Sequence, residues 1–366
     1  MFKNNLNIAL RMLAKQRAFA LINVSGLAIG IACFLLIFLY VKNEFSYDSQ
    51  HQQKDQIYRI TSTFTFGGET TTRASTGHPQ PMAYKQDVPE IEEIVRLDAD
   101  IAVVSKGREF IEQRNVIYAD AALFEVFNFE VVDGFLPTSF SQLNGVVITE
   151  KMALKYFGEK AAAGKTLRMN VQEELEPFSI VAVIKDHPGN SSFNFEMVLP
   201  WAKGLRQIPE RRQASWENIS IQCFVKLVPG ADAQQLAEKL EAVKAARNPG
   251  DQGEFARSIK NDLQALSDIH LNADIPGFDG LGATRSGQRF LLAFGHCLNH
   301  FIGSLYQLCQ PIYRTGTAKG QRGWGEKSSW STQKTAGSTV SYRSLPDVFH
   351  GPGTRVDTHG SFIACV

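Results

Sequence analysis

The chain has 366 residues, and its 38 lysines and arginines almost balance its 37 aspartates and glutamates, which gives a formal net charge of +1. Balanced charge gives no argument for an acidic partner or for nucleic acid, so we expect no nucleic-acid binding. The length allows one or two globular domains.

An uncharged apolar stretch covers residues 18–41, AFALINVSGLAIGIACFLLIFLYV. As a helix with a rise of about 1.5 Å per residue it would be roughly 36 Å long, enough to cross a hydrocarbon layer about 30 Å thick. A cleaved signal peptide has an apolar core of only about 7 to 15 residues and a small-residue cleavage site. We therefore predict one uncleaved transmembrane helix that anchors the chain.

The leader before this span, residues 1–17, carries basic residues and no acid, whereas acidic residues follow the span. Because basic residues are kept on the cytoplasmic side, we predict a cytoplasmic N-terminus and an exported body. The leucines of the leader recur at helical spacing. This fits either an amphipathic helix lying on membrane lipid or an ordinary basic leader for the anchor.

Three residues inside the span predict contact with another helix. Gly26 and Gly30 form a GxxxG pair, which lets a second helix approach closely, although small residues are common in any span. Asn23 is polar at a depth where an unpaired amide is costly, which favours a neighbouring helix over bare lipid. We predict Asn23, Gly26 and Gly30 as a helix-packing site.

From residue 42 to about residue 279 the apolar segments become short and mixed in period. Alternating or β-branched residues predict strands at 57–66, 178–185 and 223–228. Helices are predicted after Thr149 and after Asp232, two residues that can cap a helix N-terminus. Strands interleaved with short helices indicate a two-lobed mixed α/β body, so the predicted fold class is a membrane-anchored α+β chain.

Cysteines give this body no disulfide framework, because Cys223 is the only one of the five cysteines that falls between residues 42 and 279. We therefore expect the body to be held together by burial alone.

No pattern in this body predicts catalysis. Residues 158–166, GEKAAAGKT, have five residues between the glycines where a phosphate-binding loop has four, and they follow a predicted helix rather than a strand. The histidines at 51, 78, 187 and 270 are scattered without a second ligand at metal spacing, so we expect them on the surface or in loops. We predict no catalytic, metal-binding or cofactor-binding residue and no enzyme activity.

A series of phrases, each weak alone, occurs along the chain in this order: NVSGLAIGIACFLLIFLYVKNEFSYD, HQQKDQIYRI, VIYADAALFEVFNFEVVDG, GVVITEKMALKYFGEKAAAGKTLRMN, FSIVAVIKDHPGNSSFNFEMVLP, WENISIQCFVKLVPGADAQQLAEKL and LQALSDIHLNADI. With these phrases, residues 1 to about 275 resemble permease subunits of ABC transporters of the macrolide-exporter and lipoprotein-release type. These belong to the MacB/FtsX-like superfamily and carry a MacB-like periplasmic core domain.

The resemblance implies a permease subunit that does transport work without catalysis of its own. A separate cytoplasmic ABC ATPase would hydrolyse ATP and move the membrane helices, and the motion would pass to the periplasmic body by mechanotransmission. It also implies the bacterial inner membrane, a permease dimer, and a periplasmic adaptor and outer-membrane channel as further partners. The alternative is a complete membrane-anchored periplasmic binding or adaptor protein.

Residues 280–366 depart from this resemblance. A family permease continues with three more spans, whereas no uncharged apolar run after Phe301 approaches membrane length. Codons can be chosen for residues 305–327 such that reading them in a frame shifted by one base encodes a close match to a known phrase. Family permeases carry that phrase where their second span enters the cytoplasm. We therefore predict a frameshifted, truncated and disordered tail, in which HCLNH at 296–300 is no metal site. Such a form would lack the coupling helices and would not transport.

Overall fold

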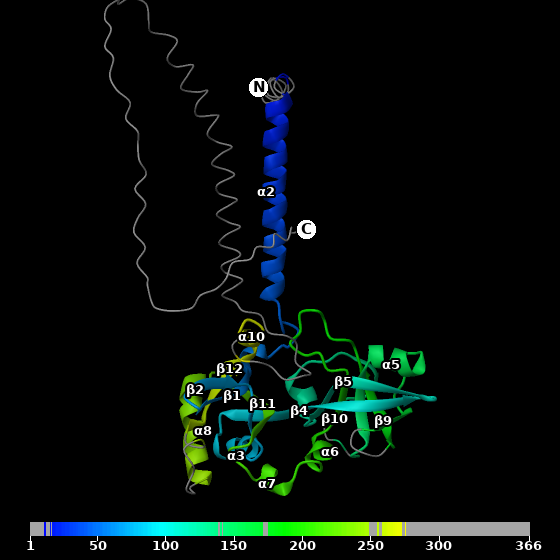
Figure 1. The fold of residues 1–366 in the computed structure, drawn as a ribbon, viewed down its shortest axis with the longest axis vertical. Coiled ribbons are helices and arrows are strands. Elements are labelled where there is room, and N and C mark those ends of the chain that lie inside the picture. The colour runs from blue at the N-terminus through cyan, green and yellow to red at the C-terminus, as the bar shows by residue number, and fades with distance from the viewer. Residues whose placement is uncertain are drawn as a thin grey trace, which may run out of the picture. The chain divides into compact units, whose positions relative to one another are not determined.

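Figure 1 shows a computed structural model of the chain. The structure describes residues 17–137, 142–170, 175–248 and 258–272, together with Arg11, Lys15, Phe140, Phe255 and Ile275. Most of the predicted leader (1–17) lies outside the described residues. So does the predicted tail (280–366), with its frameshift, its disorder and HCLNH.

Helix α2, Arg17–Glu44, contains the whole of the predicted span at 18–41. Among the described residues, its segment Val24–Glu44 is the one helix long and apolar enough to cross a membrane. Large apolar side chains along it are exposed, for example Ile29 and Leu36, which are 64% and 68% exposed. The predicted N-terminal apolar helix is confirmed, and its outward-facing side chains suit contact with lipid.

Twelve strands form one hydrogen-bonded network in the order β12-β1-β11-β4-β5-β10-β7-β9-β6, with β2 beside β1, β3 beside β11, and β8 beside β4 and β9. Their bounds are β1 Ile57–Phe66, β2 Glu69–Arg73, β3 Thr76–Gly77, β4 Ile91–Lys106, β5 Glu109–Ala119, β6 Val131–Gly134, β7 Gly145–Thr149, β8 Thr166–Asn170, β9 Leu175–Ile184, β10 Met197–Pro200, β11 Ile219–Leu227 and β12 Lys260–Ala265. The three predicted strands are confirmed by β1, β9 and β11.

Short helices connect these strands, as the sequence predicts. Their bounds are η1 Lys54–Gln56, α3 Gln80–Asp87, α4 Leu123–Val126, α5 Glu150–Phe157, α6 Trp201–Leu205, α7 Glu210–Gln213, α8 Ala233–Arg247 and α10 Leu266–Ile269. The segment at 158–166 joins α5 to β8, so it runs from helix to strand, in the opposite sense to a phosphate-binding loop.

The caps of the two predicted helices differ. Asp232 caps α8 as expected, because its side chain accepts a hydrogen bond from the Gln234 N–H at 2.9 Å. Thr149 occupies the N-cap position of α5, but its hydroxyl makes no capping hydrogen bond. At the other end Gly158 takes a left-handed conformation with φ of 77°, which closes α5 at the predicted residue.

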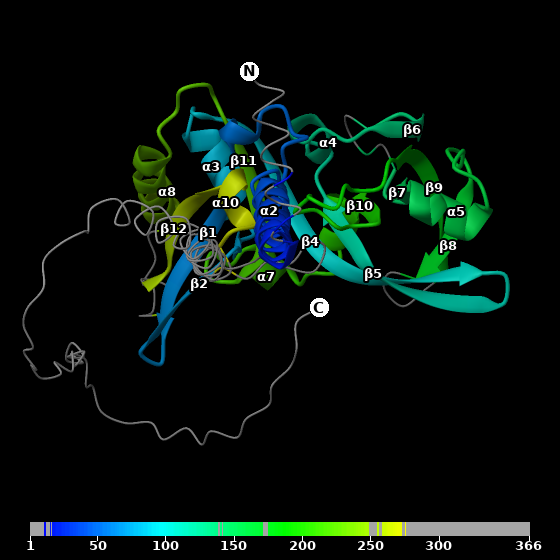
Figure 2. The same cartoon turned by 90° about the horizontal axis from the view of Figure 1, so that it is seen from above.

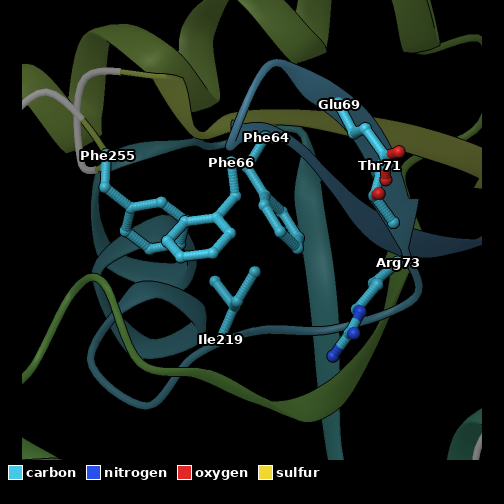
Figure 3. Close-up of a pocket in the computed structure, with 7 residues that line it drawn as sticks. All are labelled: Phe64, Phe66, Glu69, Thr71, Arg73, Ile219 and Phe255. Atoms are coloured by element: carbon cyan, nitrogen blue, oxygen red, sulfur yellow. The ribbon is translucent and has the colours of Figure 1, made fainter.

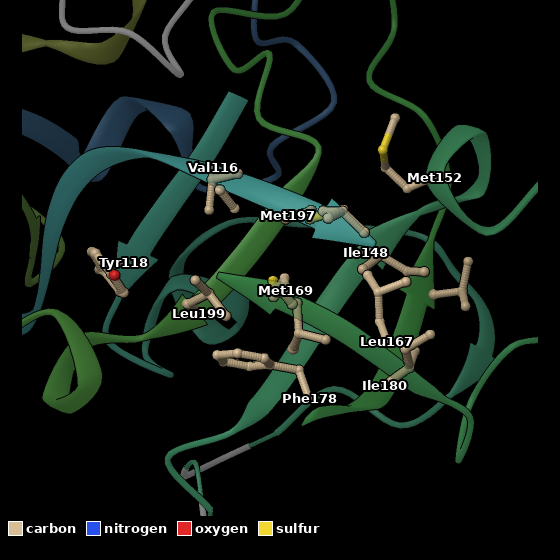
Figure 4. Close-up of a cluster of buried hydrophobic side chains, with 14 of the residues drawn as sticks. Val116, Tyr118, Ile148, Met152, Leu167, Met169, Phe178, Ile180, Met197 and Leu199 are labelled. Carbon is tan, nitrogen blue, oxygen red and sulfur yellow. The ribbon is translucent and has the colours of Figure 1, made fainter. Parts of the chain in front are cut away.

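Three buried clusters form the core of the body, one at each end of the sheet and a third that joins strands from both ends. Helices α3 and α8 cover one end of the sheet and α5 covers the other (Figure 2). The first core packs Tyr84 of α3 and Leu236 and Leu240 of α8 against strand residues such as Ile60. The second gathers side chains such as Phe178 between β8, β9, β10 and α5 (Figure 4). Fully burying side chains of this size contributes about 1.5 to 3 kcal/mol each.

Candidate functional site

The end of α2 is attached to the body by a buried contact between a carboxylate and an imidazole. Glu44 is the last residue of α2, and its Oε2 lies 2.7 Å from Nε2 of His270, which directly follows α10. The two side chains are only 3% and 2% exposed. Tyr47 stacks on the His270 ring with centroids 3.3 Å apart and planes 7° apart. The contact joins residues 226 positions apart in the chain.

A sharp turn after α2 adds a second attachment to the body. Asp48 adopts a positive φ of 56°, and its N–H donates to the Asn190 carbonyl at 3.0 Å. Its Oδ1 accepts from the Ser192 N–H at 2.8 Å. In return the Asn190 amide donates to the Ser46 carbonyl and hydroxyl, at 3.0 and 2.9 Å. We call Glu44, Tyr47, Asp48, Asn190 and His270 the helix–body joint.

Charge in the joint is held away from water. Burial raises the pKa of Asp48, while the hydrogen bonds from Ser192 and the nearby charge of His270 oppose the increase. The second oxygen of Asp48, Oδ2, has no hydrogen-bond partner among the residues that the structure describes. Because a buried carboxylate is costly without compensation, the positions of its partners in the joint are closely constrained.

Beneath the turn, His51 fills an aromatic pocket. Its Nδ1 accepts a hydrogen bond from the Asn128 N–H at 3.1 Å, and its ring meets Phe127, Phe129 and Phe193 edge-on at 5.1, 5.9 and 6.0 Å. Burial, reinforced by the nearby His187, lowers the pKa of His51 to about 4. The ring therefore packs as a neutral aromatic side chain.

This burial predicts that acid destabilises the body. A folded-state pKa of about 4 lies below the unfolded value of 6.5, so the contribution of His51 is complete above pH 6.5 and is lost as the pH falls towards 4. The full loss would be about 3 kcal/mol. We expect His51→Asn, which keeps a hydrogen-bond acceptor but does not titrate, to flatten the fall in unfolding free energy between pH 6.5 and 4. Chemical denaturation at several pH values measures this, and an unchanged slope would contradict it.

All four histidines lie in loops or turns, as one of the two predicted positions requires, but three of the four are not on the surface. His51, His78 and His270 are 1%, 6% and 2% exposed, and His187 is partly buried, with its Nε2 2.9 Å from the Phe195 carbonyl. The phenylalanines that surround His51 come from segments distant in sequence, so the spacing of the histidines does not report its burial. In the part of the chain that the structure describes, no group of three metal-ligating side chains comes together.

The predicted helix-packing residues lie on α2, apart from the joint. Gly26 and Gly30 are partly exposed one turn from each other, and a side chain added at Gly26 would meet nothing within 4 Å. The side chain of Asn23 lies outside the described residues. Packing through Asn23, Gly26 and Gly30 therefore stays a prediction.

Sequence reasoning missed the joint, although its residues lie in phrases quoted above. Asp48 ends KNEFSYD, Asn190 lies in DHPGNSSF, and His270 lies in SDIHLNADI. Nothing in their spacing indicates contact, because the fold alone brings these three segments together.

The similarity to known proteins covers α2 and most of the body. The family described as MacB-like periplasmic core domain matches residues 20–243. A domain of a putative permease protein from Porphyromonas gingivalis is 20% identical, with a TM-score of 0.49, over 59% of this chain and 91% of that chain. The periplasmic region of MacB from Actinobacillus actinomycetemcomitans is 15% identical, with a TM-score of 0.41, over 58% and 90%.

A third solved structure is the extracellular domain of the noncanonic ABC-type transporter YknZ from Gram-positive bacteria. It is 14% identical, with a TM-score of 0.38, over 56% of this chain and 99% of that chain. No curated protein matches the chain.

Proposed function

The chain belongs to the ABC-transporter permease family that carries the MacB-like periplasmic core domain, and on this premise we propose that it couples ATP hydrolysis by a separate cytoplasmic ATPase to movement of its exported body. The proposed transporter is of the macrolide-export or lipoprotein-release type. In this proposal the subunit itself catalyses nothing, and the sequence contains no Walker loop.

The helix–body joint is the observation that carries this proposal. A membrane helix can move a domain only if its end is fixed to that domain. Here a buried carboxylate–imidazole contact, a stacked ring and hydrogen bonds in both directions fix the end of α2 within the five residues 44–48. Closely packed contacts of this kind transmit a displacement instead of absorbing it.

The proposed topology puts residues 1–17 in the cytoplasm, the span 18–41 in the inner membrane and residues 42–279 in the periplasm. A reporter enzyme that is active only after export, fused after residue 60, would be active in this arrangement. We further propose that Asn23, Gly26 and Gly30 pack against another membrane helix, in a permease dimer or within a larger bundle. A periplasmic adaptor and an outer-membrane channel complete the proposed assembly.

The test is to purify the tagged full chain from membranes of its host after chemical cross-linking and to identify its partners by mass spectrometry. We expect an ATPase subunit with nucleotide-binding motifs, and we expect it to be lost when residues 1–41 are replaced by an unrelated anchor. Recovery of periplasmic proteins without any ATPase, from a chain that is correctly anchored and exported, would favour a membrane-anchored binding or adaptor protein instead.

A further inference from the structure

Strand β2 forms an exposed hairpin with β1 at one side of the body. The hairpin turns through Gly67 and Gly68, both with positive φ, and its pairs run from Phe66 opposite Glu69 to Ser62 opposite Arg73. A two-residue turn makes the pair next to it hydrogen-bonded, and hydrogen-bonded pairs then alternate along the ladder. The N–H and C=O groups of Thr70 and Thr72 therefore point away from β1.

No strand among the described residues pairs with this outer edge of β2. In the described part of the chain β2 pairs with β1 alone, and neither Thr70 nor Thr72 makes a main-chain hydrogen bond to any other element. An unpaired edge is a template for another strand, and proteins usually protect it with lysine, proline or a bulge. The sequence of β2, ETTTR, contains neither lysine nor proline, and its two charges are of opposite sign and stand at the ends of the strand.

The hairpin has two chemically different faces. Threonine hydroxyls line one face, where Thr63 bonds to Thr72 at 2.8 Å and Thr65 to Thr70 at 3.1 Å. The other face borders a pocket of about 400 Å³ (Figure 3), lined by Phe64, Phe66, Glu69, Thr71, Arg73, Ile219 and Phe255. The Phe66 side chain is 74% exposed there. A strand added at this edge would continue both faces, because directly opposite residues share a face.

The sequence of β2 is complementary to itself in an antiparallel pair. With Thr71 opposite Thr71 of a second copy, Glu69 of each chain lies opposite Arg73 of the other. The same register places Thr70 opposite Thr72, and these are the residues whose main-chain groups point outward. Hydrogen bonding and charge thus select one register, and it has the two-fold symmetry of an isologous dimer.

We propose that β2 is a dimerisation edge, through which two copies of this chain join their hairpins into one antiparallel sheet across a two-fold axis at Thr71. Opposite-charge pairs close both ends of the contact, and the aromatic faces of the two copies lie on the same side of the joined sheet. The contact is small, but anchors in one membrane hold two copies at a high effective concentration, at which a weak edge contact forms.

The proposal deepens the proposed function and rests on its permease dimer. It concerns a contact between exported bodies, whereas the proposed function is tested by the cytoplasmic ATPase. If the ATPase is recovered but the edge contact is absent, only the edge proposal fails. If the edge contact forms and no ATPase is recovered, only the coupling function fails.

Cysteine cross-linking of the full chain in native membranes tests the edge. The background replaces Cys33, Cys297, Cys309 and Cys365 by serine and keeps Cys223, which is fully buried. In the proposed register the two Thr71 residues form a non-hydrogen-bonded pair with Cα atoms about 4.5 Å apart, within the range that a disulfide bridges. We expect Thr71→Cys to give a disulfide-linked dimer under mild oxidation.

The matched control is Thr65→Cys, an exposed threonine on β1 of the same hairpin. In the proposed dimer the two copies of this residue are separated by at least three strand spacings, roughly 14 Å, which is too far for a disulfide. Equal cross-linking at both positions would indicate random collision and would overturn the proposal.

Exchanging the charges of Glu69 and Arg73 distinguishes a second copy of this chain from any other partner at the edge. Glu69→Arg alone places like charges opposite each other at both ends of the edge and should lower the Thr71→Cys cross-linking rate roughly tenfold. Combining it with Arg73→Glu restores opposite charges only if the partner is the same chain, so cross-linking should recover. Failure of this double variant to recover, with the thermal unfolding temperature unchanged, would overturn the proposal in favour of a foreign strand at the edge.

Discussion

Replacing His270 by alanine is expected to lower the unfolding free energy of the body by about 3 to 5 kcal/mol. The loss combines a hydrogen bond to a buried carboxylate, worth about 1.5 to 3 kcal/mol, with the cavity that the buried ring leaves, since the Glu44 and His270 side chains are only 3% and 2% exposed. The variant also removes the ring on which Tyr47 stacks. Thermal unfolding of the detergent-solubilised chain, followed by circular dichroism, should show a fall of roughly 10 °C in the melting temperature.

The control for this variant is an ion pair in water. Lys185 and Glu130 approach to 3.1 Å, but their side chains are 56% and 70% exposed. Such pairs contribute at most about 1 kcal/mol, so Lys185→Ala should change the melting temperature little. The double variant Glu44→Gln, His270→Ala should recover part of the lost stability, because it replaces a buried carboxylate by a neutral amide. Equal effects of His270→Ala and Lys185→Ala would contradict a buried, energetically coupled joint.

The same variant separates stability from coupling. If the joint transmits the motion of α2, disrupting the joint should leave the ATPase bound to the membrane region, while the body should no longer respond to ATP. Spin labels on the bodies of the two copies would measure that response as a change in distance. An unaltered response in a folded His270→Ala variant would remove the joint from the proposed mechanism.

Elements determined by local pattern are predictable from the sequence. The uncharged run at 18–41 gives α2, the alternation of IYRITSTFTF gives β1, and Asp232 with apolar residues at helical spacing gives α8. These patterns depend on neighbours within a few residues, so burial on one face can be inferred from the sequence.

The joint could not be predicted in the same way. Glu44 and His270 are brought together by the path of the whole sheet, and Asp48 meets Asn190 through a loop between β9 and β10. The His51 environment likewise depends on Phe127 and Phe193, which come from two distant segments. Thr149 shows the limit even for local features, since the predicted capping residue is in place but its capping hydrogen bond is absent.

Replacing Arg59 is expected to have the opposite effect to replacing His270, namely to raise the unfolding free energy of the body. The side chain lies fully buried on β1, where Nη2 donates to Gln264 Oε1 at 2.6 Å while Nε and Nη1 have no partner in the described part of the chain. Among the described residues no carboxylate pairs with it. Burial lowers its pKa to about 10 from 12.5, which corresponds to a cost of about 3 kcal/mol for keeping the guanidinium charged.

We expect Arg59→Met to raise the unfolding free energy by about 2 kcal/mol, because the flexible apolar side chain fills the space without a charge. The gain is smaller than the charging cost because Gln264 loses a hydrogen bond, worth about 1 kcal/mol. The lowered pKa still lies far above neutrality, so Arg59 stays charged and the gain should be constant from pH 5 to 8. Chemical denaturation at three pH values would measure it.

Arg96 provides the matched control for this substitution. Its guanidinium donates to both oxygens of Asp120, at 2.8 and 2.7 Å, and lies over the Trp201 ring at 4.9 Å. Arg96→Met breaks a compensated pair and should destabilise the body, whereas Arg59→Met removes an uncompensated charge and should stabilise it. If both substitutions destabilise the body, the charge of Arg59 is compensated and the prediction is wrong. If Arg59→Met raises the unfolding free energy and Arg96→Met lowers it, the buried charge of Arg59 on β1 reduces the stability of the body.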